Sequence, residues 1–299
     1  IMFRDDIMDR VKHIEEQYKK GQRYMPNFCG HLKDEPVSFA KADMGKTRVF
    51  AGAPLDWTIV VRKYLLSFIR VAQNNRFIFE GAPGIVAQSI EWHQLYEFLT
   101  QHGKDRIVAG DYKSFDKRMP PSFILEAFRL IKEILKEGGN YDDEQLLVVD
   151  GISFDTAFPL IDFNGDLVEY FGSNPSGHPL TVTINSLVNS LYMRYCYYLL
   201  NPKKEAITFQ DNVALMTYGD DNIMGVSKNA YWFNHTSIME TLKDELDIVY
   251  TMPDKTSESC KYMNISEASF LKRDFKHDDN IGCIVAPLAS SSLQKMLML

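Results

Sequence analysis

The chain has 299 residues, of which 45% are hydrophobic and 12% aromatic, and its 40 acidic and 33 basic side chains give a net charge of −7. This composition excludes a disordered chain and is sufficient for one large domain or two ordinary domains with a sizeable core. The acidic balance weighs against a nucleic-acid partner, because Lys and Arg make phosphate contacts, although local basic clusters can outweigh it.

Apolar periodicity and turn residues predict strands and helices that alternate in one α/β body. Helices are expected at Asp5–Lys20, Trp57–Ala72, Val86–Thr100 and Tyr231–Leu246, strands at Ile107–Asp111 and Ile248–Thr251, and an irregular polar connection at Tyr24–Arg48. Ser122 is expected to cap a helix that buries one face and ends at Gly138-Gly139. Asn164-Gly165 predicts a hairpin turn.

The longest apolar stretch and the cysteines bound the cellular setting. Leu180–Leu200 is long enough to cross a bilayer, but its Asn and Arg residues predict a buried helix that starts near Pro179. The four cysteines lack CxxC spacing, so we expect four free thiols in a reducing compartment and no zinc site: Cys29, Cys196, Cys260 and Cys283. The chain starts at Ile1 without Met or a signal peptide, which suggests a processed product or a fragment.

The stretch Leu215–Val226, LMTYGDDNIMGV, has two apolar runs around the turn-forming sequence Tyr218-Gly219-Asp220-Asp221. This pattern predicts a β-hairpin with two carboxylates at its tip. Such carboxylates suit Mg²⁺, which is held by one or two protein carboxylates together with waters and substrate phosphates. The alternative is a solvated acidic turn, because a short motif alone has a high false-positive risk.

A second acidic pair, Asp111 and Asp116, follows the apolar strand expected at 107–111. Together with the hairpin, Asp111 and Asp220 would supply carboxylates from two strand ends, which is the arrangement needed to hold two metal ions for displacement at phosphorus. Alternatively, Asp111 caps a helix and Asp116 is a surface charge.

A third polar segment, Ser176-Gly177, joins a loop to the apolar helix. Thr181 and Asn185 lie four residues apart and therefore share one face of that helix, so both could point into one cleft. Alternatively, the two side chains satisfy backbone carbonyls or each other.

These segments, in this order, resemble the motifs of RNA-directed RNA polymerases from positive-strand RNA viruses of the picornavirus-like order. Asp111-x4-Asp116 is similar to motif A, Ser176-Gly177-x3-Thr181-x3-Asn185 to motif B, Tyr218-Gly-Asp-Asp221 to motif C, Lys255 to the lysine of motif D, Phe270-Leu-Lys-Arg273 to motif E, and Leu32-Lys33-Asp34-Glu35 with Lys41, Lys46 and Arg48 to motif F. The resemblance covers most of the chain, and the shared order makes it specific.

The resemblance implies a right-hand polymerase of the α/β (α+β) class, with an antiparallel palm sheet flanked by helices, fingers partly present and the thumb mostly absent. The implied boundaries are 1–105 for the fingers, 106–121 for the palm with motif A, 122–170 for a fingers insertion, 171–275 for the palm with motifs B to E, and 276–299 for the start of the thumb. The implied location is the host cytoplasm, at membrane-associated replication complexes.

The resemblance also implies the reaction, which is template-directed RNA synthesis by two-metal phosphoryl transfer. Asp111 and Asp220 would hold two Mg²⁺ ions, for which Mn²⁺ can substitute, and Asp221 would assist. Lys255 would be a general acid that protonates the leaving pyrophosphate. The implied partners are an RNA template and primer, nucleoside triphosphates, a protein primer and other viral replication proteins.

The remaining implied roles concern substrate binding. Asp116 and Asn185 would read the ribose 2′-OH, and Ser176 and Gly177 would form a movable loop near the template. The other nucleotide-binding residues would be Thr181, Lys33, Lys41, Lys46 and Arg48, and the primer backbone would be held by Lys272 and Arg273.

Two rival functions remain open from the sequence. A reverse transcriptase shares the palm and the acidic hairpin, but it carries an aromatic residue where this chain has Asp116. A non-catalytic RNA-binding or scaffolding protein would use the acidic residues as surface charge and would bind no metal pair.

Overall fold

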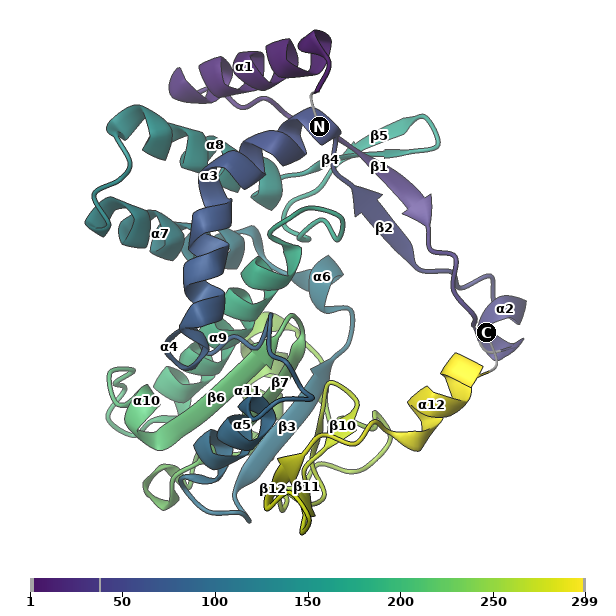
Figure 1. Cartoon of the computed structure of the whole chain (residues 1–299), viewed down its shortest axis with the longest axis vertical. Helices are drawn as coiled ribbons and strands as arrows, with labels where there is room; N and C mark the ends of the chain where they lie inside the picture. Colours follow the sequence, from purple (N-terminus) through teal and green to yellow (C-terminus); the bar gives the residue numbers. More distant parts are fainter. Residues whose placement is uncertain (1–2, 38, 298–299) are drawn as a thin grey trace. The chain divides into compact units, whose positions relative to one another are not determined.

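The computed structural model describes residues 3–37 and 39–297. The chain splits into two compact units, of which unit 1 comprises Ile1–Val71 and Asp116–Ile184, and unit 2 comprises Ala72–Phe115 and Asn185–Leu299. Residues 1, 2, 38, 298 and 299, which belong to the expected fingers and thumb ranges, lie outside the described part. Each unit combines its own sheet with helices (Figure 1).

Unit 1 contains a four-stranded sheet of order β2-β1-β4-β5. Its strands are β1 (Asn27–Leu32), β2 (Val49–Gly52), β4 (Leu160–Phe163) and β5 (Asp166–Glu169). The hairpin turn predicted at Asn164-Gly165 joins β4 to β5. The connection at 24–48 was expected not to be regular throughout, and it contains β1 and the short helix α2 (Phe39–Asp43) between irregular segments. Strand β1 pairs in parallel with β4, more than a hundred residues away, and local sequence cannot reveal this partner.

Besides α2, the helices of unit 1 include α1 (Asp5–Lys19), α6 (Phe115–Arg118), α7 (Pro121–Glu137), α8 (Asp143–Ala157) and the greater part of α3 (Leu55–Asn74). The buried Asp155 of α8 accepts hydrogen bonds from Tyr18 Oη at 2.6 Å and Arg23 Nε at 2.8 Å, and Trp57 Nε1 donates to Tyr18 Oη at 2.8 Å. This network ties α1 and α3 to α8. The expected cap at Ser122 was wrong, because α7 starts one residue earlier, where Pro121 suits a first turn.

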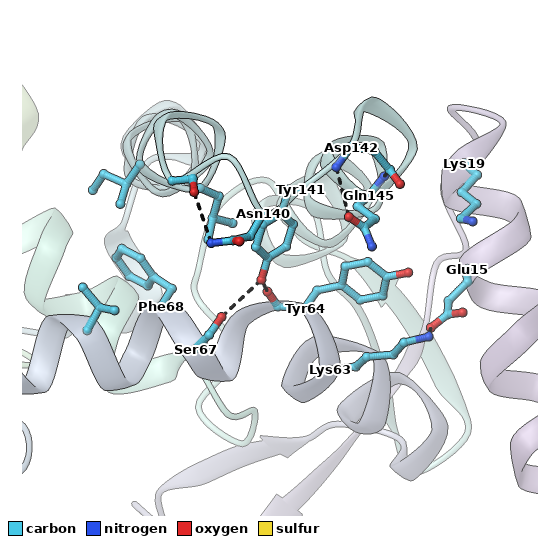
Figure 2. Close-up of a pocket in the computed structure, with 14 residues that line it drawn as sticks. Glu15, Lys19, Lys63, Tyr64, Ser67, Phe68, Asn140, Tyr141, Asp142 and Gln145 are labelled. Atoms are coloured by element: carbon cyan, nitrogen blue, oxygen red, sulfur yellow. Dashed lines mark hydrogen bonds and ion pairs between the residues drawn. The ribbon is translucent and has the colours of Figure 1, made fainter.

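Unit 1 also has a hollow of about 800 Å³ between α1, α3 and the connection from α7 to α8 (Figure 2). Tyr141 Oη donates to the carbonyl oxygen of Tyr64 at 2.5 Å, and Lys63 Nζ pairs with Glu15 Oε1 at 2.6 Å along its wall. None of the site residues predicted from the sequence lines this hollow. The candidate chemistry therefore lies elsewhere.

Unit 2 is built on an antiparallel sheet of order β6-β7-β3-β8. Its strands are β3 (Ile107–Tyr112), β6 (Val213–Tyr218), β7 (Asp221–Val226) and β8 (Tyr250–Thr251). The predicted hairpin is confirmed as β6 and β7. Two small hairpins follow, formed by β9 (Ser269–Phe270) with β10 (Arg273–Asp274) and by β11 (Lys276–Asp278) with β12 (Cys283–Val285).

The helices of unit 2 are α4 (Arg76–Phe79), α5 (Glu91–Thr100), most of α9 (Thr181–Leu200), α10 (Phe209–Asn212), α11 (His235–Leu246) and α12 (Ser290–Leu297), with a 3-10 turn at Lys228–Ala230. Trp92, Leu95 and Leu99 of α5 pack in one core cluster with apolar residues of β3, β6 and β7. Helix α5 begins at Glu91 rather than at the expected Val86, and α11 begins at His235 rather than at the expected Tyr231.

Residues 3–37 and 39–297 include all four cysteines and the long apolar stretch at 180–200. The four cysteines are free thiols, as predicted. Among these residues no helix combines the length and the apolar character that crossing a membrane requires, and the stretch 180–200 is the predicted helix, α9.

Candidate active site

The register of unit 2 gathers the predicted carboxylates at one end of its sheet. Gly110 of β3 pairs with Asn222 of β7, so Asp111 and Asp221 are the next residues toward the same end of the two strands. The β6–β7 turn consists of Gly219 and Asp220, and Gly219 takes a left-handed backbone conformation with φ +64°. Glycine adopts this conformation without strain, which allows the tight turn that presents Asp220.

Lys255 reaches the same place from the loop that follows β8. Thr251 of β8 pairs with Asp111, and Lys255 Nζ lies 2.8 Å from Asp111 Oδ2. The lysine side chain is 66% exposed and the aspartate 21%, so the ion pair lies at the surface of a partly buried acidic site. The structure therefore brings the predicted motif D lysine to the motif A carboxylate.

The surroundings of Asp221 affect the pKa of its carboxyl group. Burial, with the nearby carboxylates of Asp220 and Asp111, raises the pKa of Asp221 to about 6, while the ammonium groups of Lys255 and Lys272 oppose the rise. Like charges disfavour ionisation when they share a confined site. Two carboxylates and two ammonium groups thus lie near enough to Asp221 to affect its ionisation.

The oxygen donors of this cluster fit a hard divalent cation. Mg²⁺ is commonly held by one or two carboxylates plus substrate phosphates. Asp111 at the end of β3 and Asp220 in the β6–β7 turn can supply these carboxylates. Within the described residues, no three His, Cys, Asp or Glu side chains form a ready-made metal cage. Lys255 supplies the cation beside Asp111 in this structure.

Polar groups of α9 form hydrogen bonds with the β6–β7 turn and with the end of β6. Gly219 N donates to Ser186 Oγ at 2.9 Å, and Thr217 Oγ1 donates to the carbonyl oxygen of Ser186 at 3.3 Å. Asn185, predicted to read the 2′-OH, lies on the same helix and is 6% exposed.

A second support comes from the segment before α5. Thr217 N donates to the carbonyl oxygen of Glu80 at 2.8 Å, and Ala82 N donates to that of Thr217 at 2.8 Å. The buried carboxylate of Glu80 accepts from Arg194 of α9 at 2.5 and 2.8 Å. The strand that leads into the acidic turn is thus fastened to α9 through Glu80.

In unit 1, the predicted motif B loop is held against β2. Ala51 N donates to Ser176 Oγ at 3.3 Å, and Ala53 N donates to the carbonyl oxygen of Gly177 at 3.0 Å. A Cβ atom on Gly177 would lie 2.4 Å from the carbonyl oxygen of Ala51, so only glycine fits. Thr181 Oγ1 donates to the loop carbonyl oxygen of Pro175 at 2.9 Å. This contact matches the alternative that the Thr181 side chain satisfies backbone carbonyls.

The predicted motif F residues lie in the connection between β1 and β2, also in unit 1. Lys33 Nζ and Arg48 Nη1 lie 3.6 and 3.5 Å from opposite oxygens of Glu35. Lys41 is in α2, and Lys46 is exposed and follows the turn at 44–45. Asp116, the second acid of motif A, begins the short helix α6 with Phe115 and belongs to unit 1.

The predicted primer-binding pair lies in the β9–β10 hairpin of unit 2. Lys272 occupies its turn with φ +59°, and it is close enough to lower the pKa of Asp221. Arg273 Nη1 instead donates to the carbonyl oxygen of Ala286 at 2.7 Å.

With this geometry established, similarity to known proteins decides the family. A family model described as viral RNA-dependent RNA polymerase matches residues 3–298. The chain belongs to this polymerase family. The resemblance drawn from the six motifs is thereby confirmed.

Relatives of the chain occur in viral polyproteins. The chain is 32% identical over 284 residues to the replicase polyprotein of Cricket paralysis virus, covering 90% of this chain and 16% of the polyprotein. It is 30% identical over 266 residues to the RNA1 polyprotein of Tomato black ring virus, covering 87% of this chain and 12% of the polyprotein. The chain therefore spans less than a fifth of these two relatives.

A solved structure confirms the polymerase fold. The Sicinivirus 3Dpol RNA dependent RNA polymerase superposes with a TM-score of 0.81 at 20% sequence identity, over 97% of this chain and 58% of that one. The predicted right-hand polymerase fold of mixed helices and sheets is therefore correct.

The sequence analysis did not single out Glu80, Asn189 or Tyr112; Asn189 Nδ2 donates to the carbonyl oxygen of Gly219 in the acidic turn, and Tyr112 Oη donates to Asn189 Oδ1. One signal was present, because Thr181, Asn185 and Asn189 recur every four residues in a helix that is otherwise largely apolar. Glu80 gave no such signal, since its partners Thr217 and Arg194 are more than a hundred residues away.

Proposed function

We propose that this chain is part of a viral replicase that synthesises RNA from ribonucleoside triphosphates on an RNA template. The observation that carries the proposal is the meeting of Asp111, Asp220 and Asp221 at one end of an antiparallel sheet in a chain of this family. Family membership favours this function over the reverse-transcriptase and scaffolding alternatives.

We assign unit 2, with its antiparallel sheet, to the palm and unit 1 to the fingers. The packing of α5 on the sheet supports placing residues 72–105 with the palm rather than with the fingers. Residues 276–299 would begin a thumb. The units divide between residues 115 and 116 and between 184 and 185, so this assignment moves the boundaries expected at 121 and 171.

In this proposal, Asp111 and Asp220 hold two Mg²⁺ ions with help from Asp221, and Mn²⁺ can substitute. When bound, these ions lower the pKa of the primer 3′-OH and neutralise charge on the triphosphate. Lys255 Nζ, which lies beside Asp111, donates its proton to the leaving pyrophosphate. The lysine side chain is exposed, so it can exchange the carboxylate for a phosphate oxygen.

The remaining assignments concern substrate selection. Asp116 and Asn185 would accept or donate hydrogen bonds to the ribose 2′-OH, which distinguishes ribonucleotides from deoxyribonucleotides. Ser176, Gly177 and Thr181 would shape the loop near the template and nucleotide, and the basic side chains would hold phosphates and the primer: Lys33, Lys41, Lys46, Arg48, Lys272 and Arg273. A protein primer and other replication proteins are further proposed partners.

Primer extension on a homopolymeric RNA template tests the proposal, with a longer replicase segment that includes this chain. Asp220→Asn should abolish incorporation, because it keeps the shape of the side chain but removes a ligand charge. Asp221→Asn should reduce it less and favour Mn²⁺ over Mg²⁺. Asp244→Asn, on the exposed surface of α11, is the matched control and should leave the rate unchanged.

Two results would contradict the proposal. Asp220→Asn could support synthesis like the parent, which would exclude this carboxylate as a ligand. Alternatively, the parent could prefer deoxyribonucleotides, which would indicate a reverse transcriptase.

A further inference from the structure

Asn189 lies on α9 and has 0% exposure beneath the acidic turn. Its Nδ2 donates to the backbone carbonyl oxygens of Gly219, Asp220 and Asp221, at 3.0, 3.1 and 3.3 Å. Because carbonyl oxygens only accept hydrogen bonds, the amide nitrogen of Asn189 must face the turn. The backbone that carries two of the three carboxylates is thus fastened to α9 by one side chain.

The other end of the same amide faces β3. Asn189 Oδ1 accepts a hydrogen bond from Tyr112 Oη at 3.0 Å, and Asn222 Nδ2 approaches it at 3.3 Å. Tyr112 directly follows Asp111 in β3 and is buried. Asn189 therefore bonds both to the turn that carries Asp220 and to the strand that carries Asp111.

We propose that Asn189 is a positioning residue that sets the separation between Asp111 and the carboxylates of the turn, and through it the affinity of the site for divalent cations. The inference rests on the proposed function, which makes these carboxylates metal ligands. The position requires a donor and an acceptor on one short, uncharged side chain. Leucine would fill the volume without either group.

Aspartate would fail for a different reason. It could still accept a hydrogen bond from Tyr112, but it would put a negative charge against three carbonyl oxygens of the turn. Asn189→Asp therefore removes the bonds to the turn and spares the bond to β3, whereas Tyr112→Phe removes only the bond to β3.

Mn²⁺ alone is the probe, added to the 299-residue chain while free Mn²⁺ is followed by electron paramagnetic resonance. Asn189→Leu and Asn189→Asp should weaken binding about tenfold or more, because each lost hydrogen bond to the turn relaxes the geometry of the carboxylates. Tyr112→Phe should weaken binding in the same direction. Thermal unfolding of every variant establishes that it is folded.

Two matched controls separate positioning from general stability. Asn201→Leu removes another buried asparagine, just beyond the end of α9, whose Nδ2 donates to the carbonyl oxygen of Glu205 at 2.8 Å. Tyr197→Phe removes a tyrosine hydroxyl that contacts Thr208 Oγ1 at 3.0 Å. Both controls should unfold at lower temperature and bind Mn²⁺ like the parent.

A double-mutant cycle gives the decisive readout. If Asn189 links β3 to the acidic turn, the double variant with Tyr112→Phe and Asn189→Leu should lose less Mn²⁺ affinity than the product of the two single fold-losses. Folded Asn189 variants that bind Mn²⁺ as tightly as the parent, or losses that multiply fully, would overturn the inference alone. A parent that shows no Mn²⁺ binding dependent on Asp220 would overturn the proposed function and the inference with it.

Discussion

The ring of Tyr250 lies directly against the backbone of Gly110. A Cβ atom at Gly110 would be 2.1 Å from Tyr250 Cζ and 2.4 Å from its hydroxyl oxygen. Tyr250 is itself fixed, because its hydroxyl donates to Asn222 Oδ1 at 2.7 Å. The residue before Asp111 must therefore be glycine for close packing rather than for a turn.

Gly110→Ala should lower the free energy of unfolding by about 1–3 kcal/mol, which is typical of a methyl group forced into a filled core. Urea unfolding measures the loss. Gly52→Ala is the control, because its nearest non-neighbouring atom would be 3.8 Å away and its stability should hardly change. Equal stability of the two variants would show that β3 and β8 shift apart at little cost.

Asp116→Ala should relax sugar selection, since it removes the proposed acceptor for the 2′-OH. A hydrogen bond lost from a buried partner costs roughly 1–3 kcal/mol, so the preference for ribonucleotides should fall about tenfold to a hundredfold. Competing ribonucleotide and deoxyribonucleotide incorporation measures this ratio. If both activities fall in parallel, Asp116 has a structural role in α6.

Lys255→Arg should slow incorporation and reduce the solvent deuterium isotope effect. Arginine keeps the positive charge beside Asp111, but it is effectively never deprotonated and cannot serve as a general acid. Rapid quench of single-nucleotide addition in H₂O and D₂O measures both quantities. Lys243→Arg, an exposed lysine on α11, is the control, and an Lys255 variant as fast as the parent would exclude proton donation.

His178 should make stability depend on pH below neutrality. Burial lowers the pKa of His178 from 6.5 to about 3, so the folded state favours the neutral ring. The stabilisation is complete above pH 6.5 and is lost progressively as the pH falls toward 3.

His178→Gln removes this titrating group. Between pH 6 and 4 the parent should lose about 1.4 kcal/mol per pH unit more than the variant, as expected for one additional proton taken up on unfolding. Urea unfolding across this range measures the two slopes. Parallel slopes would show that His178 is protonated as easily in the folded chain as in the unfolded chain.

Local elements of unit 2 could be predicted because their signals lie within a few residues. The β6–β7 hairpin followed from two apolar runs around Gly219-Asp220, and β3 from the run that ends at Asp111. Helix α8 was not predicted, although Asp142 and Gln145 form a capping box at its start. The sequence contained this signal, and the prediction overlooked it.

Contacts between distant segments could not be predicted in the same way. The pairing of Gly110 with Asn222 sets the separation of Asp111 from Asp221, yet it depends on the register of strands more than a hundred residues apart. The ion pair of Lys255 with Asp111 is equally remote in sequence. Motif order predicted that these residues belong to one site, and only the fold explains how they meet.

The fastening of Glu80 and Ala82 to Thr217 has a consequence for solubility. Strand β6 is at the edge of its sheet, and its sequence VALMTY is uncharged and rich in residues that favour strands. Such an edge readily recruits a strand from another molecule, which starts aggregation. By occupying the backbone groups of Thr217, the segment before α5 blocks one end of this edge against self-association.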